Sequence, residues 1–96
     1  MARLIWTQSA LADLNRLRQF LALRDPVAAR RAVAAIRLGI RQLEAFPKIG
    51  QAVDEMPPEF REWFIPFGHG GYLVRYHYSR DQVAILAVRH GREADG

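Results

Sequence analysis

A run of buried-type residues near the end of the chain, Gln82 to Val88, leads without a break into ionisable side chains. Apart from its first residue the run is apolar and rich in Val, Ile and Leu, which is typical of a strand inside a sheet. Arg89, His90, Arg92 and Glu93 follow at once. The fold must therefore place charged and titratable groups at one fixed edge of its sheet, and we expect the functional site there.

Length and composition limit what this strand can belong to. A chain of 96 residues predicts a single domain, residues 1–96, with one modest core. Half of the residues are hydrophobic and a quarter are charged, as in globular proteins. No apolar run reaches the ~18 residues of a membrane span, and we expect no signal peptide at Met1. Because cysteine is absent, we expect a cytoplasmic protein without disulfides, thiolate chemistry or Cys-ligated zinc.

The basic residues of the chain are almost all arginine. The formal net charge is +4, and thirteen of the fourteen basic residues are Arg, with Lys48 as the exception. The planar guanidinium pairs with phosphate or carboxylate through two parallel hydrogen bonds. The charge predicts an anionic partner, either nucleic acid or an acidic protein segment, although a GC-rich genome also enriches arginine.

Apolar periodicity and turn residues predict the order β-α-α-β-β-β. The expected elements are a strand Arg3–Trp6, a helix from Thr7 or Ser9 to about Leu23, a helix from Asp25-Pro26 to Phe46-Pro47, and strands Arg61–Phe67, Tyr72–Tyr78 and Gln82–Val88. We expect the residues from Lys48 to Phe60 to form an ordered loop more than a strand. The prediction is an α+β fold in which an antiparallel sheet packs against an N-terminal helical hairpin.

The same periodicities assign faces to these elements. The first helix has an apolar face of Leu14, Leu17 and Leu21; the second has Val33, Ile36, Ile40 and Leu43 on one face and Arg30, Arg37 and Arg41 on another. In the middle long strand, Tyr72, Val74, Tyr76 and Tyr78 share one face, while Leu73, Arg75 and His77 share the other, which we expect to be solvated. Gly39 predicts a close helix–helix approach, because glycine inside a helix costs ~1 kcal/mol.

Most known chemical motifs are missing. The chain contains no P-loop, dinucleotide fingerprint, HExxH or nucleophile elbow, and its three histidines are scattered. We therefore expect no metal and no cofactor. The segment Gly68-His69-Gly70-Gly71 is typical of a hairpin turn more than of a phosphate loop, and Trp6 and Trp63 are typical of core or sheet-face aromatics.

One group of side chains at the sheet edge remains as a candidate site: Arg61, Arg75, His77, Arg89, His90 and Arg92. Cleavage of RNA without a metal requires a base for the 2′-hydroxyl, cations for the phosphorane and an acid for the leaving oxygen. His90 with Arg61 and Arg92 has the required chemistry. The alternative is a set of surface cations beside a histidine whose hydrogen bonds are satisfied.

The whole chain resembles the ParE/RelE superfamily of bacterial type II toxin–antitoxin toxins. The residues that carry the resemblance are Ala10-x-x-Asp13-Leu14, Ala28-Ala29-Arg30, Leu43-x-x-Phe46-Pro47-x-x-Gly50, Arg61, Gly71-Tyr72-x-Val74-x-Tyr76 and Val83-x-Ile85-Leu86-x-Val88-Arg89-His90-x-Arg92-Glu93. The resemblance implies a small toxin, of a kind associated with plasmid stabilisation and stress responses. A cognate antitoxin would neutralise it through an extended acidic segment that wraps the helices and the sheet.

The superfamily divides by target. RelE-type toxins cleave messenger RNA on the ribosome with Lys or Arg on the middle strands and a C-terminal Arg followed by Tyr. Here the strand Arg61–Phe67 carries no lysine, position 73 is Leu73, and no Tyr follows Arg92. ParE-type toxins lack that catalytic set and inhibit DNA gyrase, and this branch is favoured.

The resemblance implies two binding surfaces. The expected target-binding residues are Arg61, Arg75, Arg89, His90, Arg92 and Glu93, and the expected antitoxin-binding residues are Leu14, Leu17, Leu21, Arg30, Arg37 and Arg41. If the protein is instead a ribosome-dependent mRNA endonuclease, Arg61, His90 and Arg92 are its catalytic residues. A third interpretation is a degenerate toxin that retains only antitoxin binding.

Overall fold

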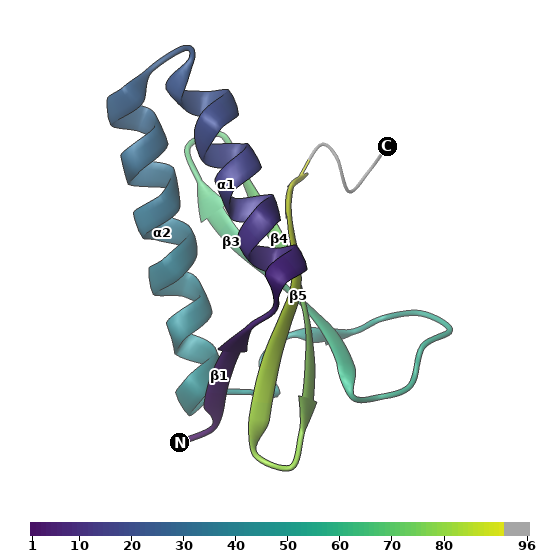
Figure 1. The fold of residues 1–96 in the computed structure, drawn as a ribbon. Coiled ribbons are helices and arrows are strands. Elements are labelled where there is room, and N and C mark those ends of the chain that lie inside the picture. Colours follow the sequence, from purple (N-terminus) through teal and green to yellow (C-terminus); the bar gives the residue numbers. More distant parts are fainter. Residues whose placement is uncertain (92–96) are drawn as a thin grey trace.

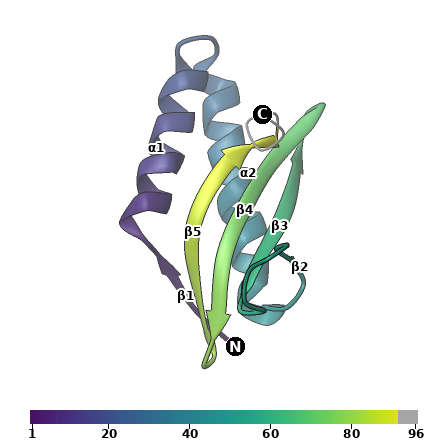
Figure 2. The same cartoon turned by 90° about the vertical axis from the view of Figure 1, so that its right-hand side faces the viewer.

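The computed structural model describes residues 1–91, which form two helices and five strands. In chain order the elements are β1 (Arg3–Trp6), α1 (Gln8–Ala22), α2 (Pro26–Ala45), β2 (Gln51–Ala52), β3 (Phe60–Phe67), β4 (Gly70–Ser79) and β5 (Gln82–His90) (Figure 1). Both helices lie on one side of the sheet, and no helix within residues 1–91 covers the opposite face of β3, β4 and β5 (Figure 2). We call it the open face. The predicted α+β fold with a helical hairpin on a sheet is confirmed.

Each helix begins at a residue whose side chain caps it. Thr7 is the N-cap of α1: its Oγ1 accepts from the Ala10 amide at 3.2 Å and donates to the Ile85 carbonyl at 2.6 Å. The hydroxyl therefore ties the start of α1 to β5. Asp25 caps α2, since its carboxylate accepts from the two amides that follow Pro26, at 3.0 and 3.2 Å. Both caps satisfy amides that have no partner within the helix.

The sheet is mixed, where an antiparallel sheet was expected. The strand order is β1-β5-β4-β3-β2, and β1 runs parallel to β5, with Leu4 opposite Val83. The remaining pairs are antiparallel. Periodicity shows which face of a strand is buried but not its direction, so the parallel pair could not be seen in the sequence. The expected loop after α2 also contains a short strand, β2, which pairs with Arg61 and Glu62 of β3.

A β-bulge in β5 keeps one face of that strand apolar. Leu86 has no partner residue in β4, so it is the extra residue of the bulge. Because the bulge shifts the alternation of side chains by one residue, Val83, Ile85 and Val88 all point to the same face. All three side chains are fully buried. Beyond the end of β1, a carboxylate oxygen of Asp13 accepts from the Val88 amide at 3.0 Å. A side chain of α1 therefore provides the hydrogen-bond partner for a backbone amide on the outer edge of β5.

The core lies between the helices and the sheet. Tyr72, Val74 and Tyr76 face it and are buried, which confirms the predicted faces of β4. Gly39 serves a contact other than the expected one. A Cβ at this position would lie 2.7 Å from Cδ1 of Ile65, so the glycine allows α2 to approach β3 rather than α1. Sequence periodicity does not reveal which neighbour a helical glycine meets.

Within residues 1–91, neither helix has the length and apolar character that crossing a membrane requires.

Candidate functional site on the sheet

A shallow depression on the open face is the candidate site. It has a volume of about 210 Å³ and is lined by Glu62 of β3, Leu73 and Arg75 of β4, and Ala87 and Arg89 of β5. Leu73 lies opposite Arg89, and Arg75 lies opposite both Glu62 and Ala87. Residues opposite each other on neighbouring strands share a face of the sheet. The side chains therefore meet because the register of three strands aligns them.

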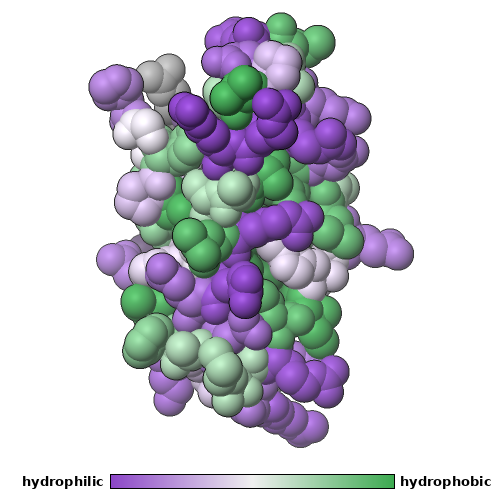
Figure 3. Space-filling view, turned by 90° about the vertical axis from the view of Figure 1, so that its left-hand side faces the viewer, coloured by the Kyte–Doolittle hydropathy of each residue, from purple (hydrophilic) through white to green (hydrophobic). Residues whose placement is uncertain are grey.

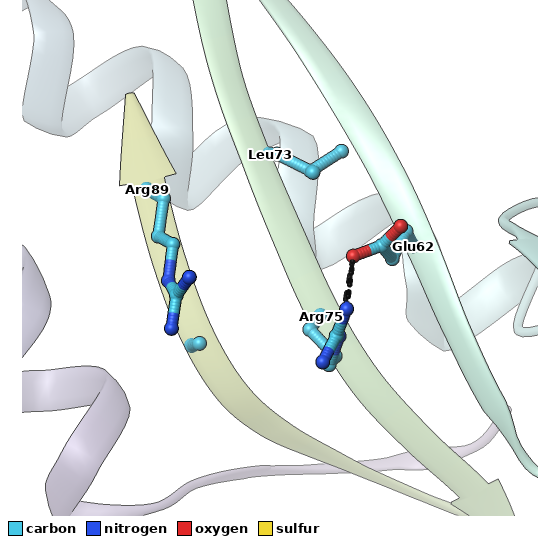
Figure 4. Close-up of a pocket in the computed structure, with 5 residues that line it drawn as sticks. Glu62, Leu73, Arg75 and Arg89 are labelled. Atoms are coloured by element: carbon cyan, nitrogen blue, oxygen red, sulfur yellow. Dashed lines mark hydrogen bonds and ion pairs between the residues drawn. The ribbon is translucent and has the colours of Figure 1, made fainter. Parts of the chain in front are cut away.

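The two arginines of this depression differ in their ion pairing. Arg75 donates from Nε and Nη2 to one carboxylate oxygen of Glu62, at 3.2 and 2.8 Å (Figure 4). Arg89 is exposed, and its side chain has no ion pair or hydrogen bond among residues 1–91. Figure 4 shows both guanidinium groups along the same face. The positive charge that remains for a partner is therefore centred on Arg89.

His90 lies on the other face of the sheet. It is opposite Tyr72, and the two rings meet edge to face with centroids 5.6 Å apart. It also lines a cleft of about 670 Å³ with Leu21 of α1, Phe67 and the glycine-rich β3–β4 turn. Successive side chains of a strand point to opposite faces. From the sequence we expected Arg89 and His90 in one cluster at the sheet edge. In the structure their side chains lie on opposite faces of the sheet.

Arg61 and Tyr76 together hold the turn that follows α2. The Arg61 guanidinium donates to the carbonyls of Gly50 at 2.8 Å and Lys48 at 3.2 Å. The Tyr76 hydroxyl donates to the Pro47 carbonyl at 2.7 Å and accepts from the Gly50 amide at 3.0 Å. Burial raises the pKa of Tyr76, and the Gly50 hydrogen bond and the Arg61 charge partly oppose that rise.

This turn explains three of the motifs that carry the family resemblance. A Cβ at Gly50 would lie 2.6 Å from the Tyr76 hydroxyl and 2.7 Å from the Glu62 carbonyl, so the position accepts only glycine. Pro47, Arg61 and Tyr76 supply the other partners of the turn. Arg61 was predicted as a target-binding and possible catalytic residue, but its guanidinium is committed to backbone carbonyls.

His77 lies opposite Phe60, and their rings meet edge to face at 4.9 Å. Glu62 was missed in the sequence, although its position across from Arg75 follows once the register of β3 and β4 is known. Arg92 and Glu93 lie outside the described residues. Within residues 1–91 no three His, Asp or Glu side chains come close enough together to hold a metal ion.

The predicted antitoxin-binding residues divide into core and surface. Leu14 and Leu17 are buried against the sheet, and Leu21 is half-buried against the same core. Leu14 and Leu17 are therefore unavailable as a docking surface in this structure, since the 3.6-residue periodicity that identified them marks the core face of α1, whereas Leu21 also lines the cleft beside His90. The large apolar side chains that the helical hairpin exposes are Leu11, Phe20, Leu23, Val27 and Leu38.

The predicted arginines of α2 are all exposed. The Arg37 guanidinium lies 5.4 Å from the centre of the Trp6 ring, a cation–π contact. Arg41 forms a long ion pair of 3.8 Å with Glu44, one turn further along the helix. Arg30 is exposed as well. This part of the prediction is consistent with a charged docking surface.

Comparisons with known proteins place these features in a family. A family model described as the ParE toxin of the type II toxin–antitoxin system parDE matches residues 4–95. Toxin RelE1 of Caulobacter vibrioides is 36% identical over 84 residues, which cover 88% of this chain and 87% of that protein.

Two solved structures share the fold. A chain of the chromosomal ParDE toxin–antitoxin system from P. aeruginosa superposes with a TM-score of 0.72 at 22% identity, covering 94% of this chain and 96% of that one. The conserved hypothetical protein HP0894 from Helicobacter pylori superposes with a TM-score of 0.56 at 18% identity, covering 96% and 97% of the two chains.

Proposed function

Because the chain belongs to the ParE toxin family of type II toxin–antitoxin systems, we propose that it inhibits DNA gyrase by binding and that a cognate antitoxin neutralises it. The open face with Arg89 is the surface that contacts gyrase, and the action takes place in the cytoplasm, where gyrase and DNA are found.

The observation that carries this proposal is the separation of the candidate catalytic groups. Cleavage of RNA requires an acid, a base and a phosphate-binding cation within hydrogen-bond reach of one substrate. Of the candidate catalytic residues, Arg61 lies opposite Tyr76 and His90 lies opposite Tyr72, four residues apart along β4. Arg89, the neighbour of His90 in the sequence, lies on the open face. Arg61 is occupied by carbonyls, and Arg75 by Glu62. This arrangement supports binding over catalysis.

The open face has the character of a protein-binding surface. Phe64 is 47% exposed there, and Leu73 and Ala87 line the depression beside Arg89. An apolar patch beside an arginine that forms no ion pair with the described residues is typical of an interface centre, where aromatic residues and arginine are enriched. The arginine would pair with a carboxylate of the target and so fix the orientation of the complex.

Graded substitutions test this proposal against the alternative, a ribosome-dependent mRNA endonuclease. We expect Arg89→Glu to abolish growth arrest when the toxin is induced, because it reverses the charge at the centre of the open face. His90→Gln should leave most of the toxicity, because His90 lies on the other face. Arg80→Glu, a charge reversal in the exposed β4–β5 turn, is the matched control and should leave toxicity unchanged.

The nuclease predicts the opposite order, because the loss of a general acid or base typically lowers a rate by ~10²–10⁴-fold. Cleavage of messenger RNA on translating ribosomes by the parent protein, lost in His90→Gln and retained in Arg89→Glu, would contradict the gyrase proposal. Circular dichroism of each variant checks that the substituted proteins remain folded.

A further inference from the structure

The depression on the open face contains two arginines and one carboxylate. Arg75 and Arg89 carry two positive charges and Glu62 one negative charge, which leaves this lining with a net charge of +1. Arg75 lies opposite Ala87 of β5, and Arg89 comes two residues later in that strand. Diagonal neighbours on adjacent strands are within reach of each other when their side chains are long. In Figure 4 the Arg89 side chain extends along β5 towards the level of Arg75, so the two guanidinium groups can bind one anion between them.

Glu62 holds Arg75 through only one of its carboxylate oxygens. Nε and Nη2 of Arg75 both donate to that oxygen, at 3.2 and 2.8 Å, whereas the strongest pairing of arginine with a carboxylate uses both oxygens in parallel. The Arg75 and Glu62 side chains are 41% and 27% exposed, and ion pairs at a protein surface contribute little to stability. Within residues 1–91 the sheet continues beyond β3 only with the two-residue β2. A released Glu62 side chain can therefore turn towards solvent.

The lining of the depression favours a protein carboxylate over a nucleic acid. Leu73 and Ala87 are apolar and can contact the CH₂ groups of an Asp or Glu side chain. A nucleic acid presents a series of phosphates, which are neutralised by several Lys or Arg side chains. Glu62 places a negative charge in this surface and repels a phosphate next to the one that is bound. The net charge of +1 thus matches a single carboxylate.

We propose that the depression binds one Asp or Glu side chain of the target protein between Arg75 and Arg89, and that Glu62 competes with that side chain for Arg75. The inference rests on the proposed binding of gyrase and adds to it the chemical group that is recognised and the contact that opposes its recognition. On binding, the target carboxylate replaces Glu62 at Arg75, while Arg89 supplies the second guanidinium. Because the existing ion pair must first be broken, Glu62 lowers the affinity of the toxin for its target.

The affinity of the purified protein for purified gyrase without DNA, measured by surface plasmon resonance, tests this inference. We expect Glu62→Gln to tighten binding by roughly 2- to 5-fold, which corresponds to one exposed ion pair. Arg75→Gln should weaken binding by roughly 10-fold, because it removes one of the two guanidinium groups and leaves Glu62 to repel the target carboxylate. The two members of one ion pair should therefore have opposite effects. An ion pair that only supports the fold would give effects of the same sign.

Glu44→Gln is the matched control for the change of charge. Glu44 is also paired with an arginine, Arg41 at 3.8 Å, and its side chain is 31% exposed, close to the 27% of Glu62. It lies on α2, on the side of the molecule where charged and apolar side chains are interspersed (Figure 3) and away from the open face. This substitution should leave the affinity unchanged. Because all three side chains are partly exposed, each variant should melt near the parent temperature.

The possible outcomes separate this inference from the proposed function. Gyrase binding by the parent protein that is weakened or unchanged in Glu62→Gln overturns the inference but leaves the proposed function intact. The absence of gyrase binding by the parent protein overturns both. An equal gain in Glu62→Gln and Glu44→Gln would show a general effect of charge and so contradict a local competitor.

A nucleic acid is the alternative occupant of the depression. Binding of single-stranded RNA that tightens in Glu62→Gln, with the affinity for gyrase unchanged, would assign the depression to a phosphate. That result contradicts the proposed carboxylate site.

Discussion

Replacing Tyr76 by Phe tests how the turn after α2 is held. The substitution removes only the hydroxyl oxygen, which donates to the Pro47 carbonyl at 2.7 Å and accepts from the Gly50 amide at 3.0 Å. The ring stays in place, since Tyr76 is fully buried and Phe fills nearly the same volume. The change therefore isolates two hydrogen bonds from the packing around them.

The expected loss of stability follows from what the hydroxyl leaves behind. A buried donor or acceptor that loses its partner costs ~1–3 kcal/mol. The Gly50 amide is buried, so the loss of its partner costs the full free energy of an unsatisfied donor. The Pro47 carbonyl is only partly buried, so it can form a hydrogen bond to water instead, which reduces the cost. We therefore expect Tyr76→Phe to lower the free energy of unfolding by about 2–4 kcal/mol, a large part of the ~5–15 kcal/mol of a small domain.

Urea unfolding and hydrogen exchange measure the two parts of this effect. The midpoint in urea should fall with little change in slope, and the Gly50 amide should exchange faster than the amides of the central strands. Tyr78→Phe is the matched control, because its hydroxyl makes no hydrogen bond within residues 1–91. A stability change below about 0.5 kcal/mol, with Gly50 exchange unaltered, would refute the view that Tyr76 anchors the turn.

Three further predictions concern the core and the pH dependence. Ile40→Ala should lower stability by about 2–4 kcal/mol through lost burial and a cavity, and an unchanged melting temperature would show that the register of α2 is wrong. Gly39→Ala should destabilise despite the ~1 kcal/mol advantage of alanine in a helix, because the new Cβ would lie 2.7 Å from Ile65 Cδ1; a more stable protein would show that Ile65 rotates away freely. Burial raises the pKa of Tyr72 and of Tyr76 above 10.0, so their contribution to stability should be complete below about pH 10 and be lost as the pH rises through the raised values; thermal melts with and without Tyr72→Phe check this.

The fold could be predicted from the sequence because its elements are encoded locally. Capping residues such as Asp25, the helix-ending Phe46-Pro47 pair and the alternation of β4 each act within a few residues, and each is found where it was expected. The parallel pairing of β1 with β5 could not be predicted, because it joins opposite ends of the chain. The same holds for the neighbour of Gly39, which is on the sheet.

The candidate site was predicted less completely, because its assembly depends on register. Arg89 and His90 are adjacent in the sequence, and we therefore predicted one cluster. Consecutive side chains of a strand point to opposite faces, so the two residues do not share a surface. The roles of Arg61 and Tyr76 also depend on contacts with residues more than ten positions away. Residue types therefore identified the chemistry that is present, and only the structure showed which groups share a surface.

The leucines of α1 illustrate the same limit. An apolar stripe at helical spacing is the signature of a core face, and Leu14 and Leu17 are buried accordingly. The exposed apolar residues of α2, by contrast, lie between arginines and are less conspicuous in the sequence.

Inhibition of DNA supercoiling by purified gyrase is the direct test of whether this toxin acts on gyrase. We expect the purified toxin to block supercoiling of relaxed plasmid in a concentration-dependent manner. Pre-incubation with its antitoxin should restore the activity, and Arg89→Glu should inhibit far more weakly than the parent protein. Full supercoiling activity at toxin concentrations that arrest growth in cells would contradict gyrase inhibition by this protein.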